Sequence, residues 1–571
     1  MKKKLIPLII VLSMVVVSVF ALAACDKNDC ETPSVNYDFF NITDNVIIGL
    51  TELGHEQSII VIPASVTSIG DRAFRAASLT TITFEQGSQL TSIGRDAFWD
   101  ATNLTSITIP ASVTSIGDGA FLNATSLTTV TFEQGSQLTS IEEAVFANAR
   151  RLTGIIIPAS VTSIGRRAFD CATNLTTVIF EEGSQLTSIG HSAFGGATSL
   201  TGITIPASVT SIGEGAFYSA ASLTTITFEQ GSQLTSIGHS AFDGATSLTG
   251  ITIPASVSWI GSGAFRGTAA WNNTPNNSVV YVDGWAVGIR GTLLGDYSLR
   301  SGTRGIGSGV FNDARSLTGI TIPASVAIIV TGAFAGATSL VSINVESDSA
   351  HFAIIEGVLY NASITCLIAA PSEITSVSIP ASVTHIWAGA FSRATSLTSI
   401  TIPSSVTSIG EIVFYGATSL TTVIFEEGSQ LTSIGLGAFW NATSLTNISI
   451  PASVVSIGQW AFHNTAIWDN TKSNSVVYID GWVIGLTGES FGYLVSYYRL
   501  RYDTRGIADG AFRSLGRDGV SIIIPVSVIF IGYGAFGVSW TIFVEGRASA
   551  PNGWSSDWLI GPFTTRVHWL G

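Results

Sequence analysis

The chain repeats itself, and this repeat restricts the possible folds more than any other feature. From about residue 59 an Ala-Phe or Val-Phe pair recurs at spacings that are mostly 23 or 25 residues, in alternation. A fixed period of about 20–50 residues is typical of solenoids, in which each repeat contacts its neighbours. The sequence therefore predicts a stack of coils. The repeated phenylalanines are Phe74, Phe98, Phe121, Phe146, Phe169, Phe194, Phe217, Phe242, Phe265, Phe311, Phe334, Phe391, Phe414, Phe439, Phe462, Phe512 and Phe536.

Two kinds of coil alternate, and this explains the two spacings. Short coils carry Ile-Pro-Ala-Ser before a valine, whereas long coils carry Phe-Glu-Gln-Gly-Ser-Gln before a leucine and are two residues longer. Pro110, Pro158, Pro206 and Pro254 consequently lie 48 residues apart. The duplicated unit is therefore a pair of coils.

The pattern inside one coil indicates which side chains point inward. In residues 104–121, alternation along an expected strand places Ile107 and Ile109 on the inner side and Ser106 and Thr108 on the outer side. Pro110 should end this strand, because proline has no backbone N–H. The spacing L-x-x-L-x-L of the strand is typical of leucine-rich repeats.

The rest of the coil is expected to close the core on its other sides. Val113 and Ile116 form a second inward-facing stretch, and Gly117 turns the chain. We expect Ala120 and Phe121 to lie on one short helical turn that fills the coil. A single coil cannot bury these residues, but stacked coils can, because each strand pairs with the next.

The phrase I-P-x-x-V-x-x-I-G-x-x-A-F closely resembles the repeat of the BspA-like leucine-rich repeat family of bacterial surface proteins. The resemblance covers roughly residues 46–545. It implies a β-rich solenoid, a right-handed stack of 23–25-residue leucine-rich repeats with hairpin inserts and a C-terminal cap. It also implies the role of that family, whose members are typically adhesins or surface proteins of unknown ligand.

The N-terminus reads as an export signal. Lys2 to Lys4 form a positive region, Leu5 to Phe20 an apolar region, and Leu22 to Cys25 follow. The tetrapeptide resembles a bacterial lipobox, which predicts a lipoprotein signal peptide over 1–24 and a lipid on the Cys25 thiol. Two acyl chains would be enough for stable membrane anchoring. The alternative is a plain secretory signal with a chance cysteine.

The remaining boundaries follow from where the repeat starts and stops. We predict a tether at 25–36, an N-terminal cap at 37–58, the solenoid at 59–545 and a C-terminal cap at 546–571, which holds Trp554, Trp558 and Trp569. Terminal repeats must cover the last open face of the core. Inserts interrupt the array near 270–306, 347–372 and 467–507.

The first and last inserts are copies of each other, 197 residues apart, and each contains Asp-Gly between alternating apolar residues. This pattern predicts a hairpin with a two-residue turn. One interpretation is that the hairpins cover a gap in the coil stack. The other is that their aromatic rings bind a sugar or a protein, which requires at least one substantially exposed ring per insert. The candidate ligand-binding residues are Trp271, Tyr281, Trp285, Trp468, Tyr478 and Trp482.

Composition and motifs argue against several functions. The chain has a formal net charge of −14 and only 11% charged residues, without a Lys/Arg cluster beyond the first four residues, so a nucleic-acid partner is not expected. Cys30, Cys171 and Cys366 share no metal-ligand spacing, and we expect Cys171 to be a small buried hydrophobe. We predict neither a metal nor a cofactor, and no enzymatic activity. Gly532 to Gly537 match G-x-G-x-x-G, but they lie on the repeat's own turn.

Two polar rows recur along the array. Glutamates in every second coil predict a solvated acidic ridge, and they are Glu85, Glu133, Glu181, Glu229 and Glu426. The outer strand positions are rich in threonine, with Gly154, Gly202, Gly250 and Gly319 as interruptions. These threonines are consistent with high β propensity alone, with a flat face for protein or glycan, or with an ice-binding face.

The sequence therefore favours a binding protein at the cell surface or outer envelope. Its expected role is that of an adhesin, contacting protein or glycan on a host or neighbouring cell, with a membrane attachment through Cys25. The alternative is a structural envelope protein that acts as a spacer without a specific ligand.

Overall fold

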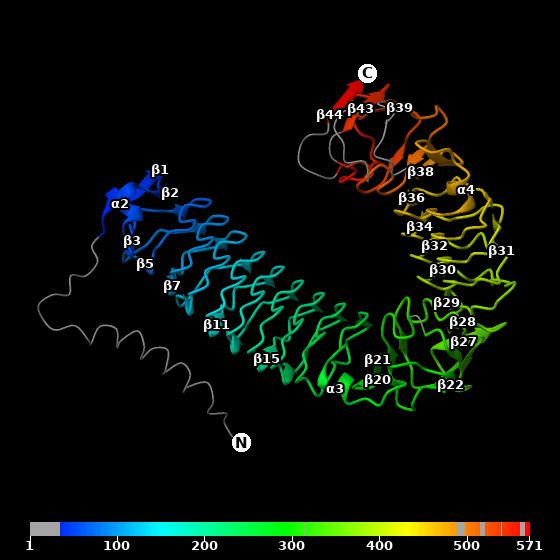
Figure 1. Cartoon of the computed structure of the whole chain (residues 1–571), viewed down its shortest axis with the longest axis horizontal. Helices are drawn as coiled ribbons and strands as arrows, with labels where there is room; N and C mark the ends of the chain where they lie inside the picture. Colours follow the sequence, from blue (N-terminus) through cyan, green and yellow to red (C-terminus); the bar gives the residue numbers. More distant parts are fainter. Residues whose placement is uncertain (1–34, 313, 488–496, 514–519, 538–539, 560–565) are drawn as a thin grey trace, which may run out of the picture. The chain divides into compact units, whose positions relative to one another are not determined.

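The computed structural model describes residues 35–312, 314–487, 497–513, 520–537, 540–559 and 566–571. Cys25, Cys30 and the predicted signal peptide lie outside this part. The chain divides at Pro206–Ala207 into two compact units, and each is a stack of β coils (Figure 1). The leucine-rich-repeat solenoid predicted from the sequence is confirmed.

In the N-terminal unit the longer strands form one parallel layer. Pairing between a short and the following long coil is complete, from Ser106↔Thr129 to Ile109↔Phe132. Pairing between a long and the following short coil stops early, at Ile82↔Ile107. The strands of this layer are β3 (Ile59–Ile62), β5 (Thr81–Phe84), β7 (Ser106–Ile109), β9 (Thr129–Phe132), β11 (Gly154–Ile157), β13 (Thr177–Phe180) and β15 (Gly202–Ile205).

A second parallel layer is built from two-residue Ser-Ile strands. Neighbouring strands pair in register, as in Ser92↔Ser115 and Ile93↔Ile116, except that the ladder is interrupted between β8 and β10. The layer comprises β4 (Ser68–Ile69), β6 (Ser92–Ile93), β8 (Ser115–Ile116), β10 (Ser140–Ile141), β12 (Ser163–Ile164) and β14 (Ser188–Ile189). Before the first coil stand η1 (Tyr37–Phe39), β1 (Phe40–Thr43), β2 (Val46–Leu50) and α2 (Glu52–His55). β2 pairs with β4, so these elements lie on the first coil.

The C-terminal unit has the same two layers, interrupted by hairpins. Its first coils hold β16 (Ser211–Ile212), β17 (Thr225–Phe228), β18 (Ser236–Ile237) and β19 (Trp259–Ile260). The first insert and the coils after it hold α3 (Ala269–Asn272), β20 (Ser278–Val282), β21 (Trp285–Arg290), β22 (Gly295–Ser298), β23 (Gly305–Ile306), β24 (Leu317–Ile322), β25 (Ile328–Ile329) and β26 (Ser342–Val345).

The rest of this unit continues the pattern. The insert near 347–372 forms β27 (Phe352–Ile355), β28 (Val358–Asn361) and β29 (Cys366–Ala369). Coils follow with β30 (His385–Ile386), β31 (Ser399–Ile402), β32 (Ser408–Ile409), β33 (Thr422–Phe425), β34 (Ser433–Ile434), β35 (Asn447–Ile448) and β36 (Ser456–Ile457). The last insert and the C-terminal coils hold α4 (Ala466–Asp469), β37 (Val476–Ile479), β38 (Trp482–Leu486), β39 (Tyr497–Arg499), β40 (Gly506–Ile507), β41 (Val520–Ile524), β42 (Phe530–Ile531), β43 (Trp540–Glu545) and β44 (Arg566–Leu570).

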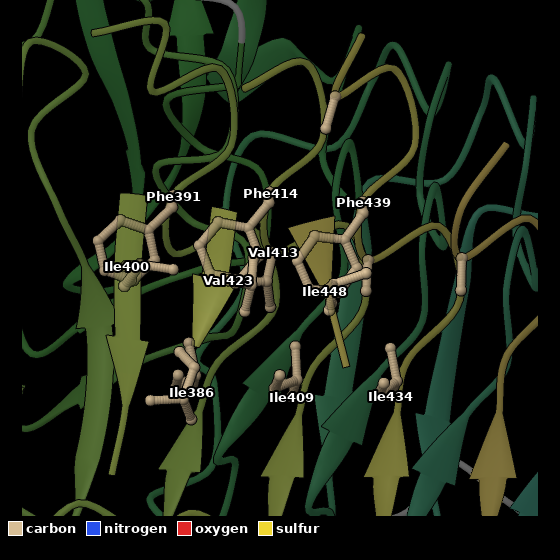
Figure 2. Close-up of a cluster of buried hydrophobic side chains, with 14 of the residues drawn as sticks. Ile386, Phe391, Ile400, Ile409, Val413, Phe414, Val423, Ile434, Phe439 and Ile448 are labelled. Carbon is tan, nitrogen blue, oxygen red and sulfur yellow. The ribbon is translucent and has the colours of Figure 1, made fainter. Parts of the chain in front are cut away.

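Equivalent side chains of successive coils stack in rows to make the core. Phe391, Phe414 and Phe439 form one such row, with ring centroids 5.3 and 5.0 Å apart and nearly parallel planes (Figure 2). The isoleucines of the two-residue strands form another row. The predicted orientation holds in residues 104–121, where Ile107, Ile109, Val113, Ile116 and Phe121 are all buried. The list of buried residues therefore follows the repeat.

The Ala-Phe segment is not the helical turn that we expected. Residues 118–123 form consecutive tight turns, with φ of +62° at Gly119 and +61° at Asn123. The Phe121 N–H donates to Val145 O in the next coil at 2.9 Å, whereas the Leu122 N–H donates back to Gly119 O at 2.9 Å. Alternate amides thus bond between coils, which a helix would not allow. This segment is a third line of contact between coils.

Candidate binding surfaces

The first hairpin has the predicted turn, and its rings are packed inside the insert. Asp283 and Gly284 both have positive φ, as the tight hairpin turn requires, and they connect β20 to β21. Trp271 lies on α3 so close to Gly288 that a Cβ there would overlap its ring. Trp285 is buried, at 1% exposure, against Gly305.

The tyrosine of this hairpin is covered by an arginine. The Arg300 guanidinium lies 3.9 Å from the centroid of the Tyr281 ring, and the Arg300 N–H donates to Tyr281 Oη at 3.2 Å. Burial raises the pKa of the Tyr281 hydroxyl. Tyr281 is therefore half-buried, and one face of its ring is occupied.

The last insert repeats this arrangement. Trp468 packs on Gly485 in the same way, and Trp482 is buried at 1% exposure. The Arg501 guanidinium lies 4.2 Å from the centroid of the half-buried Tyr478 ring. The aromatic rings of the two inserts are therefore packed in the same way, as their similar sequences suggest.

The exposed ring that an aromatic platform requires is not present in either triplet. Trp285 and Trp482 are buried, and the other four rings are half-buried under glycine backbone or arginine. Ligand binding by these six residues stays a prediction, and the packing favours the strand face as a binding surface over them.

Sequence reasoning missed a polar clamp in each insert. Asp283 Oδ2 accepts the Ile253 N–H at 2.7 Å, and Arg304 Nη2 donates to Ile253 O at 2.7 Å. The two side chains pair with each other at 3.2 Å. In the last insert, Asp480 and Arg505 hold Ile450 in the same way. The recurrence of both residues in the two copies was the available signal.

The outward side chains of the longer strands form what we call the strand face. In the N-terminal unit none of them is charged, and Thr83, Thr108 and Thr131 are exposed. Within the described part of the chain, the Thr108 and Thr131 hydroxyls form no hydrogen bond to protein. Ile156 and Ile179 pair in register on the same face. The strand face thus offers free hydroxyls beside a small apolar patch.

The repeated glutamates have a structural task that the sequence did not reveal. Glu133 Oε2 accepts the Ala111 N–H of the preceding coil at 3.0 Å, and Glu181 accepts from Ala159 at 3.0 Å. Glu85, Glu229 and Glu426 make the same bond to the preceding coil. All five are exposed, as predicted, and each also ties a long coil to the short coil before it.

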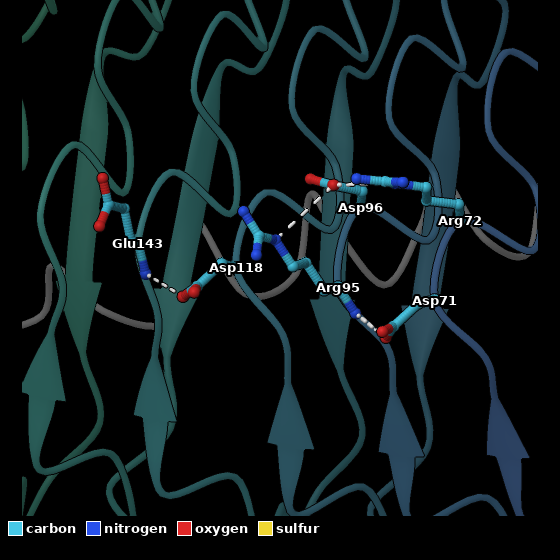
Figure 3. Close-up of polar contacts among 6 residues, drawn as sticks. All are labelled: Asp71, Arg72, Arg95, Asp96, Asp118 and Glu143. Atoms are coloured by element: carbon cyan, nitrogen blue, oxygen red, sulfur yellow. Dashed lines mark hydrogen bonds and ion pairs between the residues drawn. The ribbon is translucent and has the colours of Figure 1, made fainter. Parts of the chain in front are cut away.

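Charged residues gather instead on the turns that follow the second strand layer. Arg72 and Arg95 both contact Asp96, at 3.4 and 3.7 Å (Figure 3). Asp71 Oδ1 accepts the Arg95 N–H at 2.8 Å. Such surface ion pairs contribute about 0–1 kcal/mol each. They therefore add little to the stability of the contact between these turns.

The described residues include no cluster of metal ligands. They contain no group of three or more His, Cys, Asp or Glu side chains that could hold an ion. Cys171 is half-buried rather than fully buried, at a left-handed turn position with φ of +58°. Burial and the adjacent Asp170 raise the pKa of its thiol. No helix among the described residues is long and apolar enough to cross a membrane.

The fold and its surfaces define a leucine-rich-repeat protein. The profile described as "BspA type Leucine rich repeat region (6 copies)" matches residues 54–176, 163–286, 304–369 and 367–484. The chain belongs to this family, whose members are cell-surface proteins.

Solved structures of bacterial leucine-rich-repeat proteins are similar. A leucine-rich cell surface protein from Faecalibacterium prausnitzii is 25% identical, with 70% of this chain and 96% of that chain covered and a TM-score of 0.28. A leucine-rich repeat protein from Bacteroides ovatus is 16% identical, with 95% and 100% covered and a TM-score of 0.27. The pneumococcal vaccine antigen PcpA is 20% identical, with 81% and 84% covered and a TM-score of 0.23. No curated protein matches the chain.

Proposed function

We propose that the protein is a cell-surface adhesin that binds a protein on a host or neighbouring cell through its strand face. The observation that supports this is the uncharged row of outward strand residues, with exposed hydroxyls at Thr83, Thr108 and Thr131. Polar groups without a charge can meet a partner without the desolvation cost of ions. The proposal includes no catalytic step.

Repetition suits this role. A face that presents the same groups on successive coils can engage several weak contacts together, and linked contacts raise the overall affinity well above that of each one. We also propose that the lipid predicted at Cys25 holds the protein at the membrane, so that the coils extend from the cell. A glycan partner is the other outcome that the experiment can return.

The test is a binding screen with residues 26–571 on arrays of host proteins and glycans, followed by charge substitutions. One variant carries glutamate at three strand-face positions, and its control carries the same added charge elsewhere. The strand-face variant is Thr83→Glu, Thr108→Glu and Thr131→Glu. The control is Gln86→Glu, Thr102→Glu and Gln134→Glu, all exposed and off the strand face.

We expect the first variant to lose binding to the array hit at least tenfold and the control to retain it. Circular dichroism and thermal melting should show both folded. Equal binding by the two variants would contradict the strand face as the contact surface. If no hit appears, and deletion of one 48-residue pair of coils changes only how far the protein reaches, the spacer role is correct instead.

A further inference from the structure

The junction after β17 lacks the strand pairing of most junctions in the same sheet layer, and the coil at residues 374–380, before β31, lacks it as well. The eight residues T-G-I-T-I-P-A-S occur identically at 201–208, 249–256 and 318–325. The first copy contributes β15 and the third contributes β24, both strands. Residues 249–254 form no strand and make no ladder with β17, although β17 belongs to the coil just before them. Local sequence therefore does not explain the missing pairing.

The two coils nevertheless touch on either side of this gap. Before it, the Ser247 N–H donates to Ala221 O at 3.2 Å. After it, Ser256 Oγ donates to Ser232 O at 3.2 Å and to Leu234 O at 2.7 Å. The opening is therefore a slit within the strand face, closed at both ends, rather than a frayed end of the stack.

This slit is a groove of about 820 Å³, within the range of about 300–1,000 Å³ that is usual for ligand sites. Its lining includes Thr225, Thr227 and Thr252, with Phe228 and Pro254 as apolar surface. Gly250 borders open space, because a Cβ built on it would meet no atom within 4 Å. A ligand can therefore enter between the two coils.

The last insert supplies a closed counterpart. Asp283 and Arg304 hold Ile253 from the side away from β17, and the same clamp holds Ile450. There, however, β35 still pairs with β33, through Thr422↔Asn447 and Val423↔Ile448. The groove is thus a property of the first junction and not of the clamp alone.

The backbone of the groove suits a peptide strand. One edge of β17 faces Gly250 to Thr252. In the described structure no strand forms hydrogen bonds with the backbone N–H and C=O groups of β17 along this edge. Such groups require hydrogen-bond partners, and an extended peptide supplies them by strand addition. Four strand residues at about 3.3 Å each give room for a segment about 13 Å long.

The charge of the groove indicates which residue type the partner segment should carry. Glu229, at the C-terminal end of β17, is exposed and is the only charged residue that lines the groove in the described structure. Its Oε2 accepts the Ala207 N–H at 3.0 Å, which fixes the position of the carboxylate. A lysine or arginine of the incoming segment would meet this negative charge.

We propose that the groove between β17 and Gly250–Ile253 binds an extended segment of a partner protein, with a basic residue placed at Glu229 and the main chain added to β17 as a strand. This inference rests on the proposed function, because it specifies the kind of protein segment that the surface takes. The site differs from the strand-face threonines of the N-terminal unit, so the two proposals can fail separately.

The test uses two fluorescent hexapeptides of alternating threonine and valine, one with a lysine at its amino end and one at its carboxyl end. Binding to residues 26–571 is measured by fluorescence polarisation. At least one peptide should bind saturably, and a fully N-methylated form of it should not, because it cannot donate main-chain hydrogen bonds. Glu229→Gln should weaken binding about fivefold, the effect of roughly one exposed ion pair.

Gly250→Phe should fill the groove and reduce peptide binding at least tenfold. Its φ is not in the left-handed region, and an added Cβ meets no atom within 4 Å, so the substitution causes no backbone strain. The matched control is Asn447→Phe at the closed junction, which should bind like the unmodified protein. Thermal melts verify that both variants are folded.

Failure of both peptides to bind at millimolar concentration would overturn the inference, as would equal binding by Gly250→Phe and Asn447→Phe or full binding by the N-methylated peptide. None of these results affects the array binding of the strand-face variant. Loss of array binding without peptide binding would therefore leave the adhesin proposal standing and remove only this one.

Discussion

Truncation of one stacked phenylalanine tests the organisation of the core. Phe121 is fully buried, and its ring stacks between Phe98 and Phe146, with centroids 4.9 and 5.4 Å away. Phe121→Ala removes the ring and interrupts the row in both directions. The coils on either side then lose their contact through this position.

The expected loss can be worked from these contacts. Truncation of a buried phenylalanine to alanine costs about 3–5 kcal/mol, and each aromatic pair adds about 0.5–1.5 kcal/mol beyond buried area. Because two stacked pairs are lost and the neighbouring rings are held by their own coils, we expect a cost near the upper end, about 4–5 kcal/mol. Tyr218 is 51% exposed, and Tyr218→Ala should change stability by no more than about 0.5 kcal/mol.

The assay is urea unfolding followed by hydrogen exchange of individual coils. Solenoids need not unfold in one step, so the exchange data should show the loss concentrated in the coils around Phe121. If Phe121→Ala and Tyr218→Ala unfold at the same urea concentration, the stacked row does not hold the coils together. Uniform loss of protection along the whole chain would refute the nearest-neighbour reasoning.

Three further predictions concern other parts of the molecule. Cys25→Ala should move the protein from the membrane fraction to the soluble fraction or leave it unprocessed, and unchanged fractionation with unchanged processing excludes the lipid anchor. Tyr360 is buried, its hydroxyl has no hydrogen-bond partner among the described residues, and burial, with the charge of Glu356, raises its pKa to about 12. Since a tyrosine in the unfolded chain ionises near pH 10, the free energy of unfolding should fall as the pH rises from about 10 towards 12. Tyr360→Phe should remove that fall and stabilise the protein by about 1 kcal/mol at neutral pH, and an unchanged pH profile of unfolding would contradict this. Glu133→Ala should cost about 1 kcal/mol, because the Ala111 N–H loses its acceptor, whereas Glu133→Gln retains an acceptor oxygen, and equal unfolding midpoints for the two variants would count against the bond.

Much of the fold could be read from the sequence, because burial in a solenoid repeats with the period of the chain. Ile107 and Ile109 alternate with outward residues as strand geometry requires, and Asp283-Gly284 specifies a tight turn through its own backbone preference. These features depend on residues near one another in the chain. The pattern of one coil therefore predicts nearly all of them.

The remaining features depend on contacts between coils, which local patterns do not encode. The bond from the Ala111 N–H to Glu133 spans 22 positions, and the one from Arg304 to Ile253 spans 51. The exposure of Trp271 depends on its packing against Gly288. The identical segments at 201–208 and 249–256 differ in strand pairing, so no reading of the segment itself could locate the groove.

The bond between each long-coil glutamate and the short coil before it also restricts how such a chain can lengthen. Gain or loss of a whole pair, as between Glu133 and Glu181, leaves each carboxylate with the backbone amide that it accepts from. Gain or loss of a single coil sets two coils of one kind side by side, as at residues 379–382 and 402–405, where two short coils follow each other. Recombination between repeats should therefore favour steps of 48 residues, and natural length variants of the array should differ mostly by whole pairs of coils.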